Sequence, residues 1–170
     1  MRVIIFRHGP AAERDARRWP DDDLRPLTAR GEERTLAAAR AIVRIEPGLR
    51  LIATSPLTRA DQTARILAQA ADSVPCQVLD ALRPAGSQRA IVAFLASRPS
   101  GEVVALVGHE PDLGTLAGRL VFGTPVTMPL KKAGACMIEF EGEVTPGSGR
   151  VGWLIPPRLL RRMTGRKHET

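Results

Sequence analysis

A histidine flanked by an arginine and a glycine is the first group in this chain that could do chemistry. Arg7-His8-Gly9 follows directly after the apolar run at residues 3–6. Neutral imidazole can attack phosphorus and carry a phosphoryl group, and an arginine side chain holds phosphate oxygens with its planar set of N–H donors. We expect Gly9 to let the backbone turn and approach a ligand closely. The triplet therefore predicts a phosphoryl-accepting His8 beside a phosphate-binding Arg7.

Two further polar groups follow apolar runs in the same way. Arg59 comes soon after the run at residues 51–53, and His109 comes just after the run at residues 103–107. Because the carboxyl ends of neighbouring parallel strands meet at one edge of a sheet, where ligands bind, these groups are expected to share one crevice with His8. Such a convergence from distant parts of the chain is far more specific than any single triplet.

The segment that begins at Ser55 predicts how Arg59 is held. Ser55 followed by Pro56 is typical of a helix start, with serine as the N-cap and proline in the first helical position. Arg59 then lies in the first turn, where free N–H groups and the helix dipole attract anions. A contact of the Ser55 hydroxyl with the ligand is an accessory role, and Arg25, in a predicted loop, is a second accessory candidate.

The elements that must position these groups alternate between strands and helices. Short apolar runs predict the strands, and apolar residues at helical spacing between start and stop signals predict the helices. We expect strands at residues 3–6, 51–53, 74–79, 103–107, 135–140 and 151–155, and helices at residues 28–45, from 55 onward, at 87–96 and at 111–122. The pattern predicts one α/β domain over residues 1–170: a three-layer sandwich with a mainly parallel sheet, helices on both faces and a C-terminal antiparallel hairpin.

The composition is that of an ordinary globular protein. Hydrophobic residues make up 44% and charged residues 25% of the 170 positions. No apolar stretch is long enough to span a membrane, and the N-terminal apolar run is too short for a secretory signal. We expect Cys76 and Cys136 to be reduced core residues rather than a disulfide or a metal site. These features predict a cytoplasmic protein that does not contact a membrane.

The net charge of +7 indicates an anionic partner. Nucleic acid is not favoured, because no nucleic-acid motif is visible and aromatic residues, which would stack on bases, make up only 4% of the chain. A phosphorylated substrate needs the same positive field. The acidic run at residues 21–23 is expected to be a solvated loop that faces neighbouring arginines, and the basic tail from residue 157 to be a short helix or a frayed end.

In its motifs the chain resembles the histidine phosphatase superfamily, also called phosphoglycerate mutase-like. The triplet RHG at residues 7–9, the run SPLTRADQT at 55–63 and GHE at 108–110 are similar to its motifs in type, order and spacing. The run RPLTARG at residues 25–31 and PPRL at 156–159 resemble its small SixA-type phosphohistidine phosphatase branch. The resemblance implies that His8 is transiently phosphorylated and that Arg7, Arg59 and His109 form the phosphate pocket.

The resemblance also raises the question of a general acid. Larger members protonate an alcohol leaving group with a carboxylic acid from an inserted segment, but here the stretch at residues 80–100 is short. Asp80 is the nearest carboxylate in sequence, and Glu110 and Asp61 are alternatives. A phosphohistidine substrate eases the demand, because its leaving imidazole can already carry a proton.

Three hypotheses remain open from the sequence. The leading one is a phosphatase that acts on phosphohistidine in a protein partner, without metal or cofactor. The second keeps the mechanism and takes a small phosphorylated metabolite as substrate. The third is a module that binds a phosphorylated partner without turnover, which has no need of His8. A metal site at His8 and His109 is disfavoured, because nearby arginines repel cations and no carboxylate pair has ligand spacing.

Overall fold

A single six-stranded sheet forms the centre of the protein. The computed structural model describes residues 1–164, and its strands lie in the order β3-β2-β4-β1-β5-β6. Strands β1 to β4 are parallel where they pair, whereas β5 is antiparallel to both β1 and β6. The predicted α/β fold with a C-terminal antiparallel hairpin is therefore confirmed. The strands are β1 (Arg2–Arg7), β2 (Leu49–Thr54), β3 (Cys76–Val78), β4 (Val103–Gly108), β5 (Ala135–Glu139) and β6 (Arg150–Ile155).

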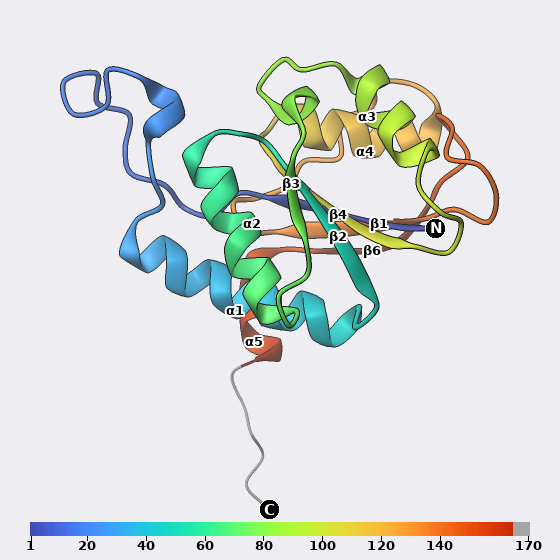
Figure 1. The fold of residues 1–170 in the computed structure, drawn as a ribbon, viewed down its shortest axis with the longest axis horizontal. Helices are drawn as coiled ribbons and strands as arrows, with labels where there is room; N and C mark the ends of the chain where they lie inside the picture. Colours follow the sequence, from blue (N-terminus) through green and yellow to red (C-terminus); the bar gives the residue numbers. More distant parts are fainter. Residues whose placement is uncertain (165–170) are drawn as a thin grey trace, which may run out of the picture.

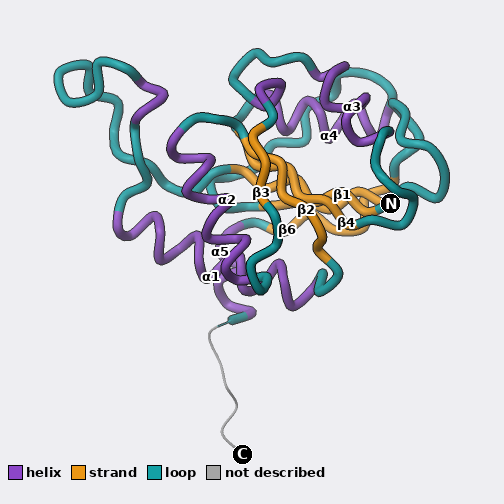
Figure 2. The backbone as a smooth tube through the Cα atoms, viewed as in Figure 1, coloured by secondary structure: helices purple, strands orange, loops and turns teal. Residues whose placement is uncertain are grey.

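Helices cover both faces of this sheet, as Figures 1 and 2 show. Alternate residues of β1 point to opposite faces, so Ile4 and Phe6 pack with α1, α2 and α5, while Val3 and Ile5 pack with α3 and α4. All four side chains are fully buried, which explains why this strand reads as a continuous apolar run. The helices are α1 (Ala29–Ile45), α2 (Thr58–Ala70), α3 (Gln88–Ala96), α4 (Asp112–Phe122) and α5 (Pro157–Met163), with short 3-10 turns η1 (Asp22–Leu24) and η2 (Asp80–Leu82).

Two of the predicted helix starts are confirmed and one is wrong. Thr28 caps α1 by accepting a hydrogen bond from the Gly31 amide at 2.9 Å, and Ser87 caps α3 in the same way. Helix α2 begins at Thr58 and not at residue 56, so Ser55 is not its N-cap. The Ser55 hydroxyl instead contacts His109 in the site described below.

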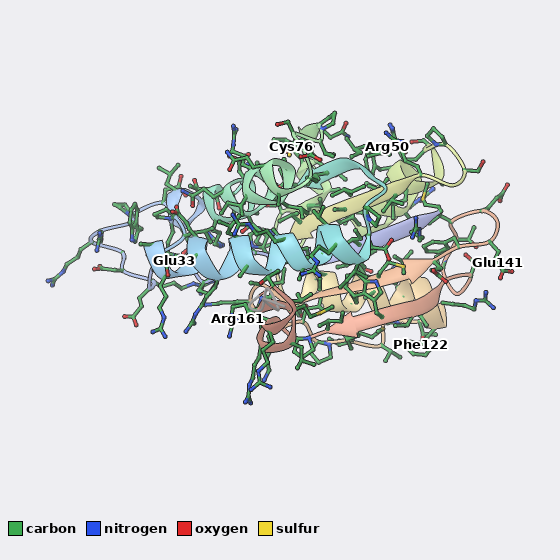
Figure 3. All side chains as sticks on the ribbon, turned by 90° about the horizontal axis from the view of Figure 1, so that it is seen from below. Glu33, Arg50, Cys76, Phe122, Glu141 and Arg161 are labelled. Atoms are coloured by element: carbon green, nitrogen blue, oxygen red, sulfur yellow. The ribbon has the colours of Figure 1, made fainter. Side chains whose placement is uncertain are left out.

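The third strand is shorter and more exposed than expected. All three residues of β3 are exposed, because β3 is the edge strand of the sheet. Cys76 is therefore a surface residue and not the core residue that we predicted, as Figure 3 also indicates. Cys136, on β5, is fully buried, and both thiols are free.

Helix α5 packs alongside α1, as Figure 3 shows from below. The Arg44 side chain donates to the Met163 carbonyl at 3.0 Å, and the Thr164 hydroxyl to the Ala37 carbonyl at 3.4 Å. The basic tail thus begins as a short helix, while Arg166, Lys167 and His168 lie outside the described residues. Within residues 1–164, no helix is long and apolar enough to cross a membrane.

Candidate active site

A pocket of about 400 Å³ opens at the carboxyl ends of the parallel strands. Strand β4 lies between β1 and β2, so the residues that follow these three strands are neighbours. The lining residues are Arg7, His8, Ala11, Ala12, Glu13, Arg14, Arg25, Arg59, Pro84, His109, Glu110 and Lys132. A larger groove of about 540 Å³ lies between α1 and α2, but it contains none of the residues singled out for chemistry.

Most candidates from the sequence thus come together, and three do not: Asp80, Asp61, and Ser55, which is fully buried and is not among the lining residues. Arg25 and Glu110 line the pocket together with the four main candidates. Asp80 does not: its side chain is 85% exposed and lies beside Arg83. Asp61 is likewise outside the pocket and pairs with Arg65 on the surface of α2 at 2.7 Å. Neither carboxylate is placed to protonate a ligand in the pocket.

His8 is held so that one ring nitrogen is free for attack. It follows β1, and its Nδ1 lies 2.7 Å from the Gly9 carbonyl oxygen. Since a carbonyl can only accept, Nδ1 carries the proton and Nε2 keeps its lone pair. Burial lowers the pKa of His8 to about 3, with further lowering by His109 and the nearby arginines. The ring is therefore neutral and nucleophilic near neutral pH.

The structure gives Gly9 a role in packing in addition to the expected one. A Cβ at this position would lie 2.0 Å from the Thr35 hydroxyl of α1, so only glycine allows this close approach of the loop to the helix. The Gly9 amide also donates to the Thr63 hydroxyl of α2 at 3.0 Å. The glycine thus fixes, between two helices, the carbonyl that orients His8.

His109 follows β4 and is oriented by Ser55. Its Nε2 lies 2.9 Å from the Ser55 hydroxyl oxygen, which also accepts a hydrogen bond from the Leu57 amide at 3.3 Å. If the serine donates its single proton to Nε2, the neutral ring carries its own proton on Nδ1. Burial, followed by the nearby arginines, lowers the pKa of His109 to about 4. The rings of His109 and His8 are 5.1 Å apart and tilted by 54°.

Three buried nitrogen atoms of the pocket have no partner within the described residues. They are Nε of Arg7, Nε of Arg59 and Nδ1 of His109. Other atoms of these side chains are occupied: Arg7 donates to the Leu130 carbonyl at 2.7 Å, and Arg59 to the Asp22 carbonyl at 2.8 Å. Buried donors are rarely left unsatisfied, so three of them in one pocket indicate a ligand rich in acceptor oxygens, such as a phosphoryl group.

Asp22 is a site residue that the sequence analysis missed. Its carboxylate bridges Arg25 at 2.8 Å and Arg59 at 3.1 Å, and Arg14 lies 3.7 Å away. The hydrogen bond from Arg25 lowers the pKa of Asp22, so the carboxylate stays charged. The acidic run does face arginines, as predicted: Asp22 pairs with Arg25 and Arg59 of the pocket, whereas Asp23 pairs with the more exposed Arg83. The repeated acidic residues within a short distance of RPLT were the only signal for this role.

The segment before β5 also reaches the pocket, and it too was missed. The Leu130 amide donates to Glu110 at 3.1 Å, and Lys132 lines the pocket directly. Burial raises the pKa of the Glu110 carboxyl. The available signal was a pair of lysines just before a strand that pairs with β1. Within residues 1–164, no group of three or more histidine, cysteine, aspartate or glutamate side chains is arranged to hold a metal ion.

The sequence and the fold are similar to those of known proteins. Residues 3–86 match the histidine phosphatase superfamily (branch 1). An uncharacterized protein from Picosynechococcus sp. is 44% identical over 138 residues, which cover 79% of this chain and 82% of the relative. The solved structure of the protein histidine phosphatase SixA complexed with tungstate is similar with a TM-score of 0.78 and 26% identity, over 94% of this chain and 99% of that one.

A more distant structure shares the fold alone. The mycobacterial glucosyl-3-phosphoglycerate phosphatase, in complex with VO3, has a TM-score of 0.68 at 16% identity, over 91% of this chain and 99% of that one. The pocket geometry, the motif match and the SixA likeness agree with one another. The chain therefore belongs to the histidine phosphatase superfamily, is of the SixA type, and is a phosphatase.

Proposed function

We propose that this phosphatase removes phosphoryl groups from phosphohistidine in a partner protein, through a covalent intermediate on His8. The observation that carries the proposal is a neutral His8 with a free Nε2, in the same pocket as three unpartnered buried nitrogen atoms. The likeness to SixA, described as a protein histidine phosphatase, supports the choice of substrate. No cofactor is required by this scheme.

The first step transfers the phosphoryl group to the enzyme. The Nε2 lone pair of His8 attacks phosphorus, the bond between phosphorus and the substrate imidazole breaks, and its electron pair leaves with that imidazole. Arg7, Arg59 and His109 donate hydrogen bonds to the non-bridging oxygens, where negative charge is concentrated. The Gly9 carbonyl accepts a hydrogen bond from the protonated Nδ1 of His8 and stabilises the positive charge that the ring acquires.

The second step regenerates the enzyme. A water molecule attacks phosphorus, the bond between phosphorus and Nε2 breaks, and the electron pair returns to His8. Both protons of the water end on the released phosphate, and His8 is again neutral with its proton on Nδ1. The low pKa of His8 favours this neutral product form.

The choice of phosphohistidine follows from the leaving group. Of the short stretch at residues 80–100, only Pro84 lines the pocket, so this stretch supplies no acid. An alkoxide leaves poorly without a proton donor. A substrate imidazole that is protonated on its far nitrogen leaves as a neutral molecule and needs no acid from the enzyme.

One observation favours a second candidate, a small phosphate ester of a metabolite. Glu110 lines the pocket, and burial raises its pKa, as expected for a carboxyl group that could protonate an alcohol. The fold is also that of glucosyl-3-phosphoglycerate phosphatase. Against this candidate, the Glu110 carboxylate already accepts a hydrogen bond from the Leu130 amide.

The test is a direct comparison of substrates in the presence of a chelator. The purified protein is assayed against a phosphohistidine-bearing protein and a panel of sugar and glycerate phosphates, with His8→Ala as the control. We expect the phosphohistidine protein to have the highest kcat/KM, and an acid-labile phosphoryl group to be trapped on His8. A wide margin for a small ester would replace this proposal with the metabolite phosphatase, and the Glu110→Gln variant would then test the acid.

A further inference from the structure

Lys132 lies at the mouth of the pocket on a short loop that is tied to the nucleophile's own strand. The Ala133 amide donates to the carbonyls of both Arg7 and His8, each at 3.2 Å. On the other side of the lysine, the Leu130 carbonyl accepts from the Arg7 side chain at 2.7 Å. The backbone on both sides of Lys132 is thus fixed relative to the reacting groups, although the lysine itself has no part in the mechanism above.

The charge environment of Lys132 is unfavourable without a ligand. None of the ion pairs found within residues 1–164 includes it. Burial, followed by the charges of Arg7, Arg25 and Arg59, lowers the pKa of Lys132. Like charges held this close repel one another, so a bound anion would relieve the repulsion.

Lys132 adds one positive charge to a pocket whose lining is already rich in positive side chains. Five positive side chains and two carboxylates line the pocket, namely Arg7, Arg14, Arg25, Arg59 and Lys132 against Glu13 and Glu110. Asp22 adds a third negative charge, because it bridges the arginines. The positive side chains therefore outnumber the carboxylates, and loss of Lys132 would remove one positive charge from the pocket.

We propose that Lys132 is a further phosphoryl-binding residue, whose ammonium balances the second negative charge of the phosphoryl group. This inference rests on the proposed function, since it takes the pocket to be the phosphoryl site. Lys132 would accordingly select dianionic over monoanionic tetrahedral ligands. The arginines and His109 supply directed hydrogen bonds to the oxygens, whereas the lysine supplies a mobile point charge at the open side.

The test uses two tetrahedral oxyanions of similar size that differ by one charge, tungstate and perrhenate. Their affinities are measured by calorimetry for the wild-type protein and for Lys132→Ala, Lys132→Arg and Lys131→Ala. Lys131 is the matched control, because its removal changes the net charge equally while its side chain lines a different hollow, beside Pro129 and Pro156. We expect Lys132→Ala to weaken tungstate binding about tenfold and perrhenate binding by less than about threefold. Lys132→Arg retains most of the tungstate affinity, and Lys131→Ala loses less than about twofold.

Three outcomes would overturn the inference. Unchanged tungstate affinity in Lys132→Ala would show that Lys132 does not bind the anion, while leaving the proposed function intact. An equal loss for both oxyanions, or an equal loss in Lys131→Ala, would reduce the effect to a general surface charge. A wild-type protein that binds no tungstate would refute the proposed phosphoryl site itself. If Lys132→Ala lowers the melting temperature, Lys132→Gln, which keeps most of the side chain, provides the same comparison.

Discussion

Replacing Gly9 by alanine tests whether the contact between the catalytic loop and α1 sets the position of His8. The added Cβ would lie 2.0 Å from the Thr35 hydroxyl and 3.3 Å from a methyl group of Leu27. Thr35 is fully buried, and its hydroxyl donates to the Gly31 carbonyl at 2.7 Å. The hydroxyl cannot move away without losing this bond, so the loop and the helix must separate.

The expected cost follows from these two effects. Overpacking of a buried contact costs about 1–3 kcal/mol, and loss of the Thr35 hydrogen bond costs about 1 kcal/mol. A total of about 2–4 kcal/mol corresponds to a fall in Tm of about 4–16 °C for a chain of this size. The Gly9 carbonyl that orients His8 moves with the loop, and a displacement of about 1 Å costs on the order of 10²-fold in rate.

The assay combines thermal unfolding with steady-state kinetics on three variants. Gly9→Ala is expected to lose both stability and kcat/KM, and the Gly9→Ala/Thr35→Ala double variant to recover part of both, because the clashing hydroxyl is gone. Gly142→Ala is the control: a Cβ there meets no atom within 4 Å, so its effect stays below about 0.5 kcal/mol. If Gly9→Ala behaves like Gly142→Ala, the contact with α1 does not position the nucleophile.

Three other predictions concern charge and protonation. Arg7→Ala and Arg59→Ala should each lower kcat/KM by about 10²–10⁴, as for lost partners of transition-state charge; losses below about tenfold for both would place the pocket elsewhere. Asp22→Ala should lower kcat/KM by at least about tenfold, mainly through kcat, because Arg59 loses the carboxylate that holds it; unchanged kinetics would make Asp22 a surface residue. Proton NMR of the imidazoles, assigned with the alanine variants, should show His8 and His109 neutral far below their ordinary pKa of 6.5, down to about 3 and about 4. Both rings are neutral in the folded and unfolded chain above pH 6.5. Below it the unfolded chain takes up protons that the folded chain does not, so the free energy of unfolding should fall as the pH drops from 6.5 toward these values. Titration of both rings near 6.5 would contradict the burial argument.

The grouping of the site could be predicted from the sequence, because strand ends are well marked in this fold. Each buried parallel strand is a short apolar run, and the polar residue that ends the run must leave the sheet at the same edge. This reasoning is sufficient to bring His8, Arg59 and His109 into one pocket, which the structure contains. The reasoning requires that the three strands be neighbours, and in the structure β4 lies between β1 and β2.

The role of Ser55 could not be read from its local pattern. A serine before a proline is typical of an N-cap, but the same hydroxyl is equally suited to a histidine nitrogen. Only the position of His109, which is 54 residues away, decides between the two. The hydroxyl thus has a tertiary partner that the local pattern does not reveal, and the helix begins at Thr58.

Asp22 and Lys132 were missed for a related reason. Both lie in segments without helix or strand periodicity in the sequence, and their positions depend on contacts with distant residues. The long loop before α1 carries Asp22 to Arg59 on α2, and the pairing of β5 with β1 brings the lysine loop to the pocket. Similarly, the apolar residues of β3 suggested burial, whereas an edge position exposes them.

The two histidines directly follow adjacent strands that are paired in matching register, and this has a consequence for how the site tolerates change. Arg7 of β1 is paired with Gly108 of β4, so His8 and His109 are the next residues on each side. Their ring separation of 5.1 Å is close to the spacing of about 4.8 Å between neighbouring strands. The pairing of β1 with β4 therefore places the two imidazoles next to each other. Substitutions in the core on either face of the sheet should change the thermal stability of the protein while leaving the distance between the two histidines unchanged. A shift of one residue in the register of β1 and β4 would instead separate the two histidines.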